Sequence, residues 1–228
     1  MCGICGIAGP NWTEQQLHSM VDILHHRGPD GEGSFIGGQV GIGNNRLSIL
    51  DLSEDGSQPM HSPDGQVHIV LNGEIYNYLE IKQDLPDYDF ASTSDTEVLL
   101  AAYLKWGKAC LNRLIGMFAF AIWDERQQTL FVARDRFGVK PLYWTRFNGN
   151  LYFASEIKAL FRAGVPHEPD EGTWSQYLTY GLYDHSDKTF WKDISSMPGG
   201  HFMLWKPGES PAFHQWYDLS AQVQSGAA

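Results

Sequence analysis

The residues best suited to chemistry stand at the start of the chain, where Cys2 directly follows Met1. The small side chain of Cys2 would allow an aminopeptidase to remove Met1. Removal would leave Cys2 with a thiol and a free α-amine on one residue. Because a thiol has a reference pKa of about 8.5 and an α-amine one of about 7.7–8.0, the amine could accept the thiol proton near neutral pH. This pairing of nucleophile and base is typical of covalent catalysis by an N-terminal nucleophile.

Plainer interpretations of the same cysteine stay open. Cys2 and Cys5 have the C-x-x-C spacing of a redox pair or of half a zinc site. The only other cysteine is Cys110, so a four-cysteine zinc site is impossible. Cys5 is more simply explained as a small buried apolar residue. We keep a metal or redox module as an alternative and look for support for catalysis elsewhere in the chain.

A thiolate that attacks a carboxamide creates an oxyanion, which needs hydrogen-bond donors already aimed at it. Asn72 and Gly73 follow an expected strand at Val67–Leu71. They offer a side-chain amide and an unhindered backbone N–H. The same dipeptide is a favoured two-residue hairpin turn, so a purely structural interpretation also remains.

Three charged residues suit a substrate that carries an α-carboxylate and an α-ammonium group. Arg46 can hold a carboxylate with its planar guanidinium, although an ion pair with Asp51 would use the same donors. Glu74 and Asp95 could hold the ammonium group. Alternatively, Glu74 is solvated and Asp95 only stabilises a helix N-terminus, which is worth roughly 0.3–1 kcal/mol.

Composition bounds the class of protein. The 228 residues, 43% of them hydrophobic, are enough for one large domain with a sizeable core. A net charge of −11 without a long basic run argues against nucleic acid and against an anionic membrane surface as partners. We find no apolar run of the roughly 18 residues that a membrane span needs, and no leader. Three cysteines fit a reducing, cytoplasmic setting better than a disulfide scaffold.

The hydrophobic pattern predicts mixed helices and strands. Capping boxes at Thr13–Gln16 and Ser94–Glu97 predict helices that run to about His26 and Trp106. Further helices are expected at 77–86, 156–163 and 173–180. Strands are expected at 33–36, 40–45, 47–51, 67–71, 117–123, 130–134, 142–147 and 151–155, with shorter ones between 190 and 217. This combination indicates two antiparallel sheets packed between helices.

Eight sequence blocks occur in one order along the chain. They are Met1–Ile4, His26–Gly31, Arg46–Ile49 with Asp51, Gln58–Met60, Asn72–Asn77, Ser94–Glu97, Gly116–Ala121 and Arg134–Tyr143. In this order and spacing they resemble the class II glutamine amidotransferase domain of glutamine-dependent asparagine synthetases. The resemblance is dense over residues 1–165 and continues loosely to Asp218, through Met197–His201 and Trp216–Leu219.

The resemblance implies an α+β fold, the four-layer αββα sandwich of N-terminal-nucleophile hydrolases, with two antiparallel sheets. It implies that Cys2 is the nucleophile and that Asn72 and Gly73 form the oxyanion hole. It places the substrate α-carboxylate at Arg46 and the backbone near Ile49. It implies that Asn72, Gly73, Glu74 and Asp95 also contact the substrate, the two acids at its α-ammonium group. His26 receives no catalytic role, and no metal or cofactor is expected.

The implied function is that of a glutaminase, which hydrolyses L-glutamine to glutamate and ammonia through a Cys2 thioester. In asparagine synthetases a second domain uses the ammonia and binds ATP through a Ser-Gly-Gly-x-Asp-Ser loop, which this chain lacks. We therefore expect a domain at residues 1–219, a flexible tail at 220–228, and an ammonia-accepting synthetase domain or subunit as partner. The alternative is a non-catalytic glutamine-binding module that needs a partner for turnover.

Overall fold

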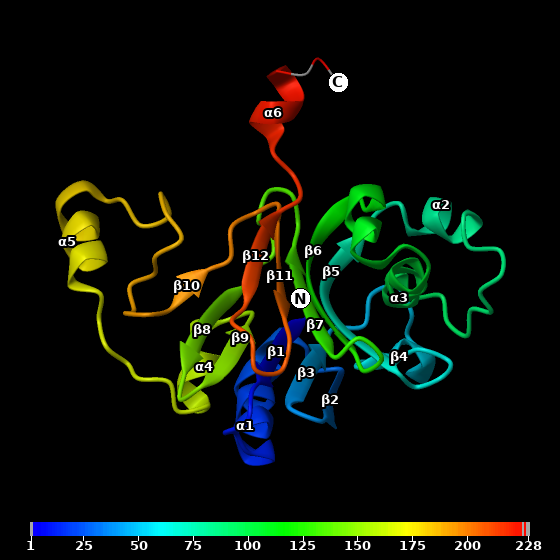
Figure 1. Cartoon of the computed structure of the whole chain (residues 1–228), viewed down its shortest axis with the longest axis horizontal. Coiled ribbons are helices and arrows are strands. Elements are labelled where there is room, and N and C mark those ends of the chain that lie inside the picture. The colour runs from blue at the N-terminus through cyan, green and yellow to red at the C-terminus, as the bar shows by residue number, and fades with distance from the viewer. Residues whose placement is uncertain (1, 225, 227–228) are drawn as a thin grey trace.

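The computed structural model describes residues 2–224 and 226, and two six-stranded antiparallel sheets form its centre (Figure 1). The sheets have the strand orders β10-β8-β9-β1-β3-β2 and β12-β11-β7-β6-β5-β4. Strands of the first sheet are β1 (Gly3–Ala8), β2 (Gly31–Gly37), β3 (Val40–Arg46), β8 (Tyr143–Phe147), β9 (Asn150–Ala154) and β10 (Ser195–Ser196). Strands of the second are β4 (Met60–His61), β5 (Val67–Ile75), β6 (Gly116–Asp124), β7 (Thr129–Arg134), β11 (His201–Trp205) and β12 (Ala212–Gln215).

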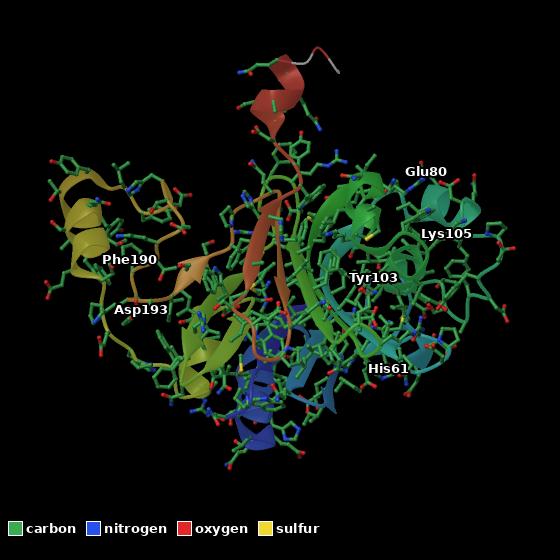
Figure 2. All side chains as sticks on the ribbon, viewed as in Figure 1. His61, Glu80, Tyr103, Lys105, Phe190 and Asp193 are labelled. Atoms are coloured by element: carbon green, nitrogen blue, oxygen red, sulfur yellow. The ribbon has the colours of Figure 1, made fainter. Side chains whose placement is uncertain are left out.

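Helices cover the outer face of each sheet. The helices α1 (Glu14–Leu24) and α4 (Ile157–Arg162) pack on the first sheet, and α2 (Tyr78–Gln83) and α3 (Asp95–Trp106) pack on the second. Tyr103 of α3, labelled in Figure 2, stacks on Phe131 of β7 with ring centroids 5.8 Å apart. The layer order helix, sheet, sheet, helix confirms the predicted αββα arrangement.

Two further helices lie outside these layers (Figure 1). The helix α5 (Glu171–Tyr180) buries only Thr173, and α6 (Leu219–Gln224) buries no side chain. The tail predicted from residue 220 is therefore helical as far as Gln224, and residues 225, 227 and 228 lie outside the described part of the chain. Three short 3₁₀ turns complete the helical content, at His25–Arg27, Glu54–Gly56 and Gly107–Arg113. In the residues described, no helix is long and apolar enough to cross a bilayer.

Strand alternation decides which side chains face the space between the sheets. In β1, Ile4 lies in the core between the sheets, whereas the next residue lies under α1. In β5, Val70 lies between the sheets and Leu71 under α3. Since side chains of a strand alternate with period two, Cys2 and Asn72 belong to the faces turned toward the other sheet. Two of the predicted catalytic residues, Cys2 and Asn72, therefore lie on the same faces as the apolar core between the sheets.

The helix caps follow the sequence signals in part. Thr13 and Gln16 form the predicted reciprocal capping box of α1. At α3, the Ser94 side chain accepts from the backbone N–H of Thr96 at 3.2 Å. The second half of that predicted box is wrong, because Glu97 accepts from the backbone N–H groups of residues 91 and 92 instead. Glu97 therefore fixes the loop that precedes α3 rather than the helix end.

Near the site, one predicted strand and one alternative interpretation are wrong. Residues 47–51 are not a strand, because the Asp51 carboxylate accepts hydrogen bonds from Ser53 and Thr93 and shapes a loop. Asn72 and Gly73 do not form a hairpin turn, because β5 continues through them to Ile75 and pairs with β6. Both differences come from contacts with distant segments, which override local propensity.

Candidate active site

The predicted residues converge where β1 begins and where β3 and β5 end. Cys2 directly precedes β1, Arg46 ends β3, and Asp95 is the first residue of α3. One polar hollow is lined by six of the seven predicted residues, namely Cys2, Arg46, Ile49, Gly73, Glu74 and Asp95. The seventh, Asn72, is fully buried and is not part of the lining. Segments that lie up to 93 positions apart in the chain therefore meet at one place.

The Cys2 thiol is held by a single backbone segment. Its Sγ accepts a hydrogen bond from the backbone N–H of Leu47 at 3.3 Å. Burial raises the pKa of Cys2 above its ordinary value, the Leu47 N–H opposes this shift, and the negative charge of Glu74 adds to it. The resting group at neutral pH is therefore the thiol, and attack requires a base. The predicted removal of Met1 concerns a residue outside the described part of the chain.

The strand β5 has an open edge beside this hollow. The backbone N–H groups of Leu71, Gly73 and Ile75 point to the same side, since alternate residues of an antiparallel strand face the same neighbour. Leu71 N–H donates to Gln58 Oε1 at 2.6 Å, and Ile75 N–H donates to Asp95 Oδ2 at 2.8 Å. Between them, the N–H of Gly73 has no acceptor within residues 2–224. It is therefore a donor available to a ligand.

Buried amides occupy the adjoining end of the inter-sheet core. The Asn72 Nδ2 donates to Ser155 Oγ at 3.4 Å, and the Asn44 Nδ2 donates to the Leu71 carbonyl at 3.4 Å. The Oδ1 atoms of Asn44 and Asn72 are buried and find no hydrogen-bond partner in the described chain. Since a buried polar group is normally paired, these atoms mark the cluster as a place with a role beyond packing.

The Arg46 guanidinium is positioned by backbone carbonyls. Its Nη1 donates to the Ser53 carbonyl at 2.9 Å, and its Nη2 donates to the Asp51 carbonyl. A Cβ on Gly56 would lie 2.2 Å from Nη2, so only glycine leaves room for the guanidinium there. The alternative ion pair with the Asp51 carboxylate is not formed, because Ser53 and Thr93 donate to that carboxylate. The Arg46 charge is thus left for a ligand.

Two acids, Glu74 and Asp95, line the same hollow as this cation. Asp95 is only 5% exposed. Burial, helped by the negative charge of Glu74, raises the pKa of Asp95 to about 6, although the hydrogen bond from the Ile75 N–H opposes the shift. Burial also raises the pKa of Glu74, whereas the positive charge of Lys140 lowers it. Because burial disfavours the charged form of each carboxylate, a cationic group bound between them would stabilise both charges.

Sequence reasoning missed the groups that hold the backbone of Cys2. The Arg27 Nε donates to the Cys2 carbonyl at 2.9 Å, and Arg27 Nη1 donates to Glu156 Oε1 at 2.8 Å. Partial burial opposes the Glu156 charge, but hydrogen bonds from Arg27, Lys158 and His26 lower its pKa to about 2. Arg27 lies in one of the eight sequence blocks, which is the only signal that could have found it. His26 contacts Glu156 and does not line the hollow.

Lys140 is a second group that sequence reasoning left without a role. It is 4% exposed, and its backbone is fixed because its N–H donates to Asp135 Oδ2 at 3.0 Å and its carbonyl accepts from Arg134. Burial lowers the pKa of Lys140, and the negative charges of Glu74 and of an ionised Cys2 oppose that shift. A positive charge on the Arg134–Tyr143 segment therefore lies near the Cys2 thiol and the Glu74 carboxylate.

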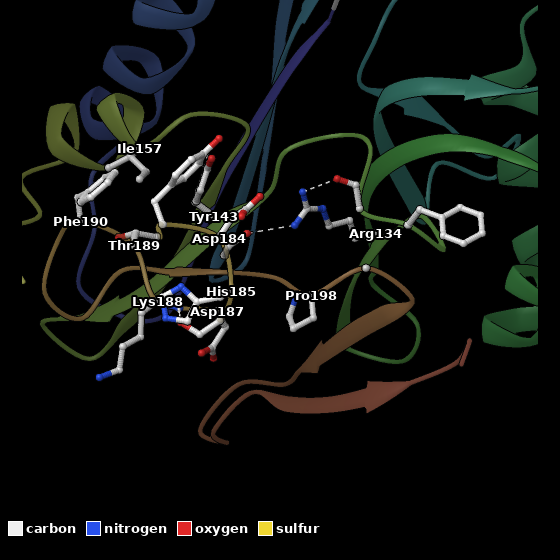
Figure 3. A pocket seen from close by; sticks show the side chains of 16 residues that line it. Arg134, Tyr143, Ile157, Asp184, His185, Asp187, Lys188, Thr189, Phe190 and Pro198 are labelled. Carbon is white, nitrogen blue, oxygen red and sulfur yellow. Dashed lines mark hydrogen bonds between the residues drawn. The ribbon is translucent and has the colours of Figure 1, made fainter. Parts of the chain in front are cut away.

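A larger hollow of about 750 Å³ contains none of the predicted residues (Figure 3). It lies between the Arg134–Tyr143 segment and the loop at 183–190. Arg134 lines it, but its donors serve the Lys140, Gly138 and Met197 carbonyls and the Ser196 hydroxyl. The Arg134 side chain therefore fixes two segments, at residues 138–140 and 196–197, and offers little to a ligand.

The alternative metal or redox site has no support in the geometry. Residues 2–224 and 226 contain no cluster of three or more His, Cys, Asp or Glu side chains that could hold a metal ion. Cys5 is fully buried in the core under α1, and burial raises the pKa of its thiol. Cys2 lines the hollow on the other face of β1, so the two thiols are not arranged as a redox pair.

The fold and this position of the thiol define the N-terminal-nucleophile class of amidotransferase domains. Comparison with known proteins supports this assignment. The sequence model of the glutamine amidotransferase domain matches residues 1–217, and the chain belongs to this family, in its class II branch.

Relatives at 37–40% identity include two kinds of protein. One is an asparagine synthetase (glutamine-hydrolysing) of Bacillus subtilis, 40% identical over 89% of this chain and 28% of its own length. Another is the amidase chry2 of Gibberella zeae, 37% identical over 90% of this chain and 30% of its own length. The chain thus spans about three-tenths of the length of these relatives.

A solved structure supports the fold independently. The glutamine phosphoribosylpyrophosphate amidotransferase of B. subtilis superimposes with a TM-score of 0.73 over 95% of this chain and 49% of its own. Its sequence identity is 21%, so this likeness concerns the fold alone.

Proposed function

We propose that this domain hydrolyses L-glutamine to glutamate and ammonia through a thioester on Cys2. The observation that carries the proposal is the free N–H of Gly73 on the open edge of β5, in the same hollow as the Cys2 thiol. A nucleophile beside an unpaired backbone donor is the arrangement that acyl transfer requires. Membership of the glutamine amidotransferase family supports glutamine as the substrate.

The charges around the hollow suit the two charged α-groups of free glutamine. Arg46, with the backbone near Ile49, would bind the α-carboxylate, and Glu74 and Asp95 would bind the α-ammonium group. A substrate without either charge would leave a buried charge unpaired, which disfavours its binding strongly. Asparagine is one methylene shorter than glutamine, so its carboxamide would not reach Cys2 when its α-groups are bound.

The reaction then follows from the positions of the groups. The α-amine of a processed Cys2 accepts the thiol proton, and the thiolate forms a C–S bond with the carboxamide carbon. The Gly73 N–H and the Asn72 amide stabilise the resulting oxyanion. Collapse breaks the C–N bond, and ammonia leaves with the proton from the α-amine. Water then attacks the thioester, which releases glutamate and restores the thiol.

The ammonia acceptor is proposed to lie on another domain or subunit. Residues 1–219 would form the glutaminase unit, and an asparagine-synthetase-like activity would use the ammonia. The longer synthetase relatives support this assignment, whereas the relative named as an amidase shows that related domains also occur in proteins of other names.

A second candidate function is glutamine binding with turnover only in the presence of that partner. The greater length of the relatives favours it, because a module that works within a longer protein would turn over only with its partner domain. Calorimetry with glutamine, compared with the rate of ammonia release by the isolated protein, distinguishes the two functions. Tight binding without release would identify the binding module.

Substitution of the nucleophile tests the proposal directly. Cys2→Ala should lower glutaminase kcat by at least about 10³-fold, since no other group can form the thioester. Glutamine binding should persist, because the α-groups are held elsewhere. Cys110→Ala is the matched control, as this buried thiol lies in the core under α3, and it should keep kcat within about twofold. Turnover retained by Cys2→Ala would refute the mechanism.

A further inference from the structure

We propose that Ser155 is a positioning residue that sets the orientation of the Asn72 side-chain amide, so that Asn72 presents its N–H donors to the oxyanion. This inference rests on the proposed function. Ser155 directly follows β9 and is fully buried, as is Asn72. It belongs to none of the groups that would touch glutamine.

One hydroxyl connects the strand of the nucleophile with the strand of the oxyanion donor. The backbone of Ser155 donates to the Ile4 carbonyl at 2.9 Å. In return, its Oγ accepts from the Ile4 N–H at 3.0 Å, two residues after Cys2. The same Oγ lies 3.4 Å from Asn72 Nδ2, across the space between the two sheets. Ser155 is therefore the direct polar contact between β1 of the first sheet and the Asn72 amide of the second.

The hydrogen-bond capacity of this pair permits two amide orientations, because the hydroxyl can accept from Nδ2 or donate to Oδ1. A serine hydroxyl has one proton to donate and two lone pairs, and Ile4 uses one lone pair. The Asn72 Oδ1 is buried with no partner among the described residues. A half-turn of the carboxamide exchanges Nδ2 and Oδ1, so that the Ser155 hydroxyl donates to Oδ1. Both N–H groups of Asn72 then face away from Ser155 and are free for the substrate.

The half-turn exchanges one unpaired group for another. It pairs the buried Oδ1 with the hydroxyl proton of Ser155, while Ile4 keeps its acceptor, and it leaves the two Asn72 N–H groups for the oxyanion. Without the hydroxyl, this productive orientation would leave the buried Oδ1 unpaired, which disfavours it. The oxygen end would then face the oxyanion in part of the molecules, and an acceptor in that place repels the developing negative charge.

Ser155→Ala tests this role. Since the donor acts only in the transition state, kcat should fall by about 5–50-fold, a fraction of the 10²–10³-fold that loss of a whole oxyanion donor costs. The KM for glutamine should change less than about twofold, because the α-groups bind elsewhere. Ser155→Thr keeps the hydroxyl and should recover most of kcat.

The matched control is Ser62→Ala. Ser62 is also buried, and its Oγ accepts from a backbone N–H, that of Val67, at 2.9 Å. Its substitution removes a similar hydrogen bond at the other end of β5 and should leave kcat within about twofold. Thermal unfolding of both variants shows whether they lose stability equally, so that a loss of kcat in Ser155→Ala alone is not a folding defect.

A double-mutant cycle separates this role from a general effect on β1. In an Asn72→Ala background, Ser155→Ala should lower kcat no further, because the amide through which Ser155 acts is already absent. Alkylation of Cys2 by iodoacetamide forms no oxyanion and should proceed at the wild-type rate in Ser155→Ala. An unchanged kcat in Ser155→Ala, or a further loss in the Asn72→Ala background, would overturn the proposal.

One readout does not depend on turnover. An aldehyde analogue of glutamine forms a hemithioacetal, in which the Cys2 sulfur bonds to the carbonyl carbon and the thiol proton passes to the carbonyl oxygen. That oxygen occupies the oxyanion position. The dissociation constant of the aldehyde should therefore rise about 5–50-fold in Ser155→Ala. Equal affinity in wild type and variant would refute the role of Ser155, whereas a wild type that binds the aldehyde but releases no ammonia would refute only the proposed function.

Discussion

Asp95 contributes to the site in two ways. Its Oδ2 accepts from the Ile75 N–H and so fixes the edge of β5, while its charge faces the place proposed for the substrate ammonium group. Burial raises its pKa to about 6, which is costly for an empty site. This cost is expected for a group whose partner is a ligand, because binding of the cation restores the favoured charge state.

Glutamine affinity should therefore depend on pH through Asp95. Below pH 6 the carboxyl group is mostly protonated and cannot pair with the ammonium group, and above pH 7 it is ionised. The dissociation constant should rise as the pH falls through about 6, by up to tenfold per unit below it. Calorimetry of the Cys2→Ala variant between pH 5 and 8 measures the dissociation constant of glutamine without turnover.

Asp95→Asn supplies the comparison. The amide cannot carry the charge, so affinity at pH 7.5 should fall about 10–100-fold, as expected for loss of a charged hydrogen bond, and the rise below pH 6 should be weaker. Asp84→Asn removes an exposed carboxylate that pairs with Arg113 at 3.1 Å and should leave both affinity and pH profile unchanged. A pH profile of Asp95→Asn identical to that of the parent protein would assign the titration to another group.

At the scale of elements, β5 shows where sequence reasoning succeeded and where it could not. Its apolar run was predicted correctly. The role of Asn72 and Gly73 rests on the family resemblance and stays a prediction. The end of β5 was predicted wrongly, because Asn72-Gly73 has turn propensity, whereas pairing with β6 over nine residues decides the outcome. The open edge of β5 could not be predicted either, since it depends on Gln58 and Asp95, which lie 13 and 20 positions from their partners.

Gly73→Ala tests whether this strand tolerates a side chain at the donor. A Cβ there would lie 2.2 Å from the Met117 carbonyl oxygen and 2.6 Å from the Phe118 Cα, both of which are backbone atoms. We expect a loss of about 1–3 kcal/mol of unfolding free energy, with displacement of the Gly73 N–H and a fall in kcat. Urea unfolding and glutaminase assays on the same preparation measure both.

Gly172→Ala is the control for the glycine substitution. Its Cβ would lie 3.4 Å from Asp170 Oδ1, an ordinary contact, and the residue lies in α5. Alanine is favoured over glycine within helices, so this variant should be equally stable or more stable by up to about 1 kcal/mol, with unchanged kcat. A Gly73→Ala protein with the stability and kcat of Gly172→Ala would show that the predicted clash is relieved at no cost.

The whole molecule brings together groups that no local pattern connects. Arg27 reaches the Cys2 carbonyl, and Ser155 reaches both Ile4 and Asn72, from elements far away in the chain. The eight sequence blocks predicted the family, the layer order and six of the residues around the hollow. They could not predict these supporting contacts, because a contact between sheets depends on how the whole sandwich is packed.

The extent of the folding unit gives the last prediction. Removal of residues 220–228 should change the unfolding midpoint by less than about 2 °C and leave kcat unchanged, because α6 buries no side chain. Removal of all residues after Pro211 should destabilise the domain strongly. It deletes β12 and Trp216. The Trp216 Nε1 donates to the Arg134 carbonyl at 3.2 Å, and the Trp216 ring stacks on Phe118.

The two truncations differ in what they do to the site. Arg134 Nε holds the carbonyl of Lys140, the buried cation that faces Glu74 and the Cys2 thiolate. Loss of Trp216 should loosen this segment, so the longer truncation should reduce glutaminase activity even below its unfolding temperature. Scanning calorimetry and ammonia release measure both effects. If the shorter truncation alone unfolded the protein, residues 220–228 would belong to the core unit, and the proposed boundary at residue 219 would be wrong.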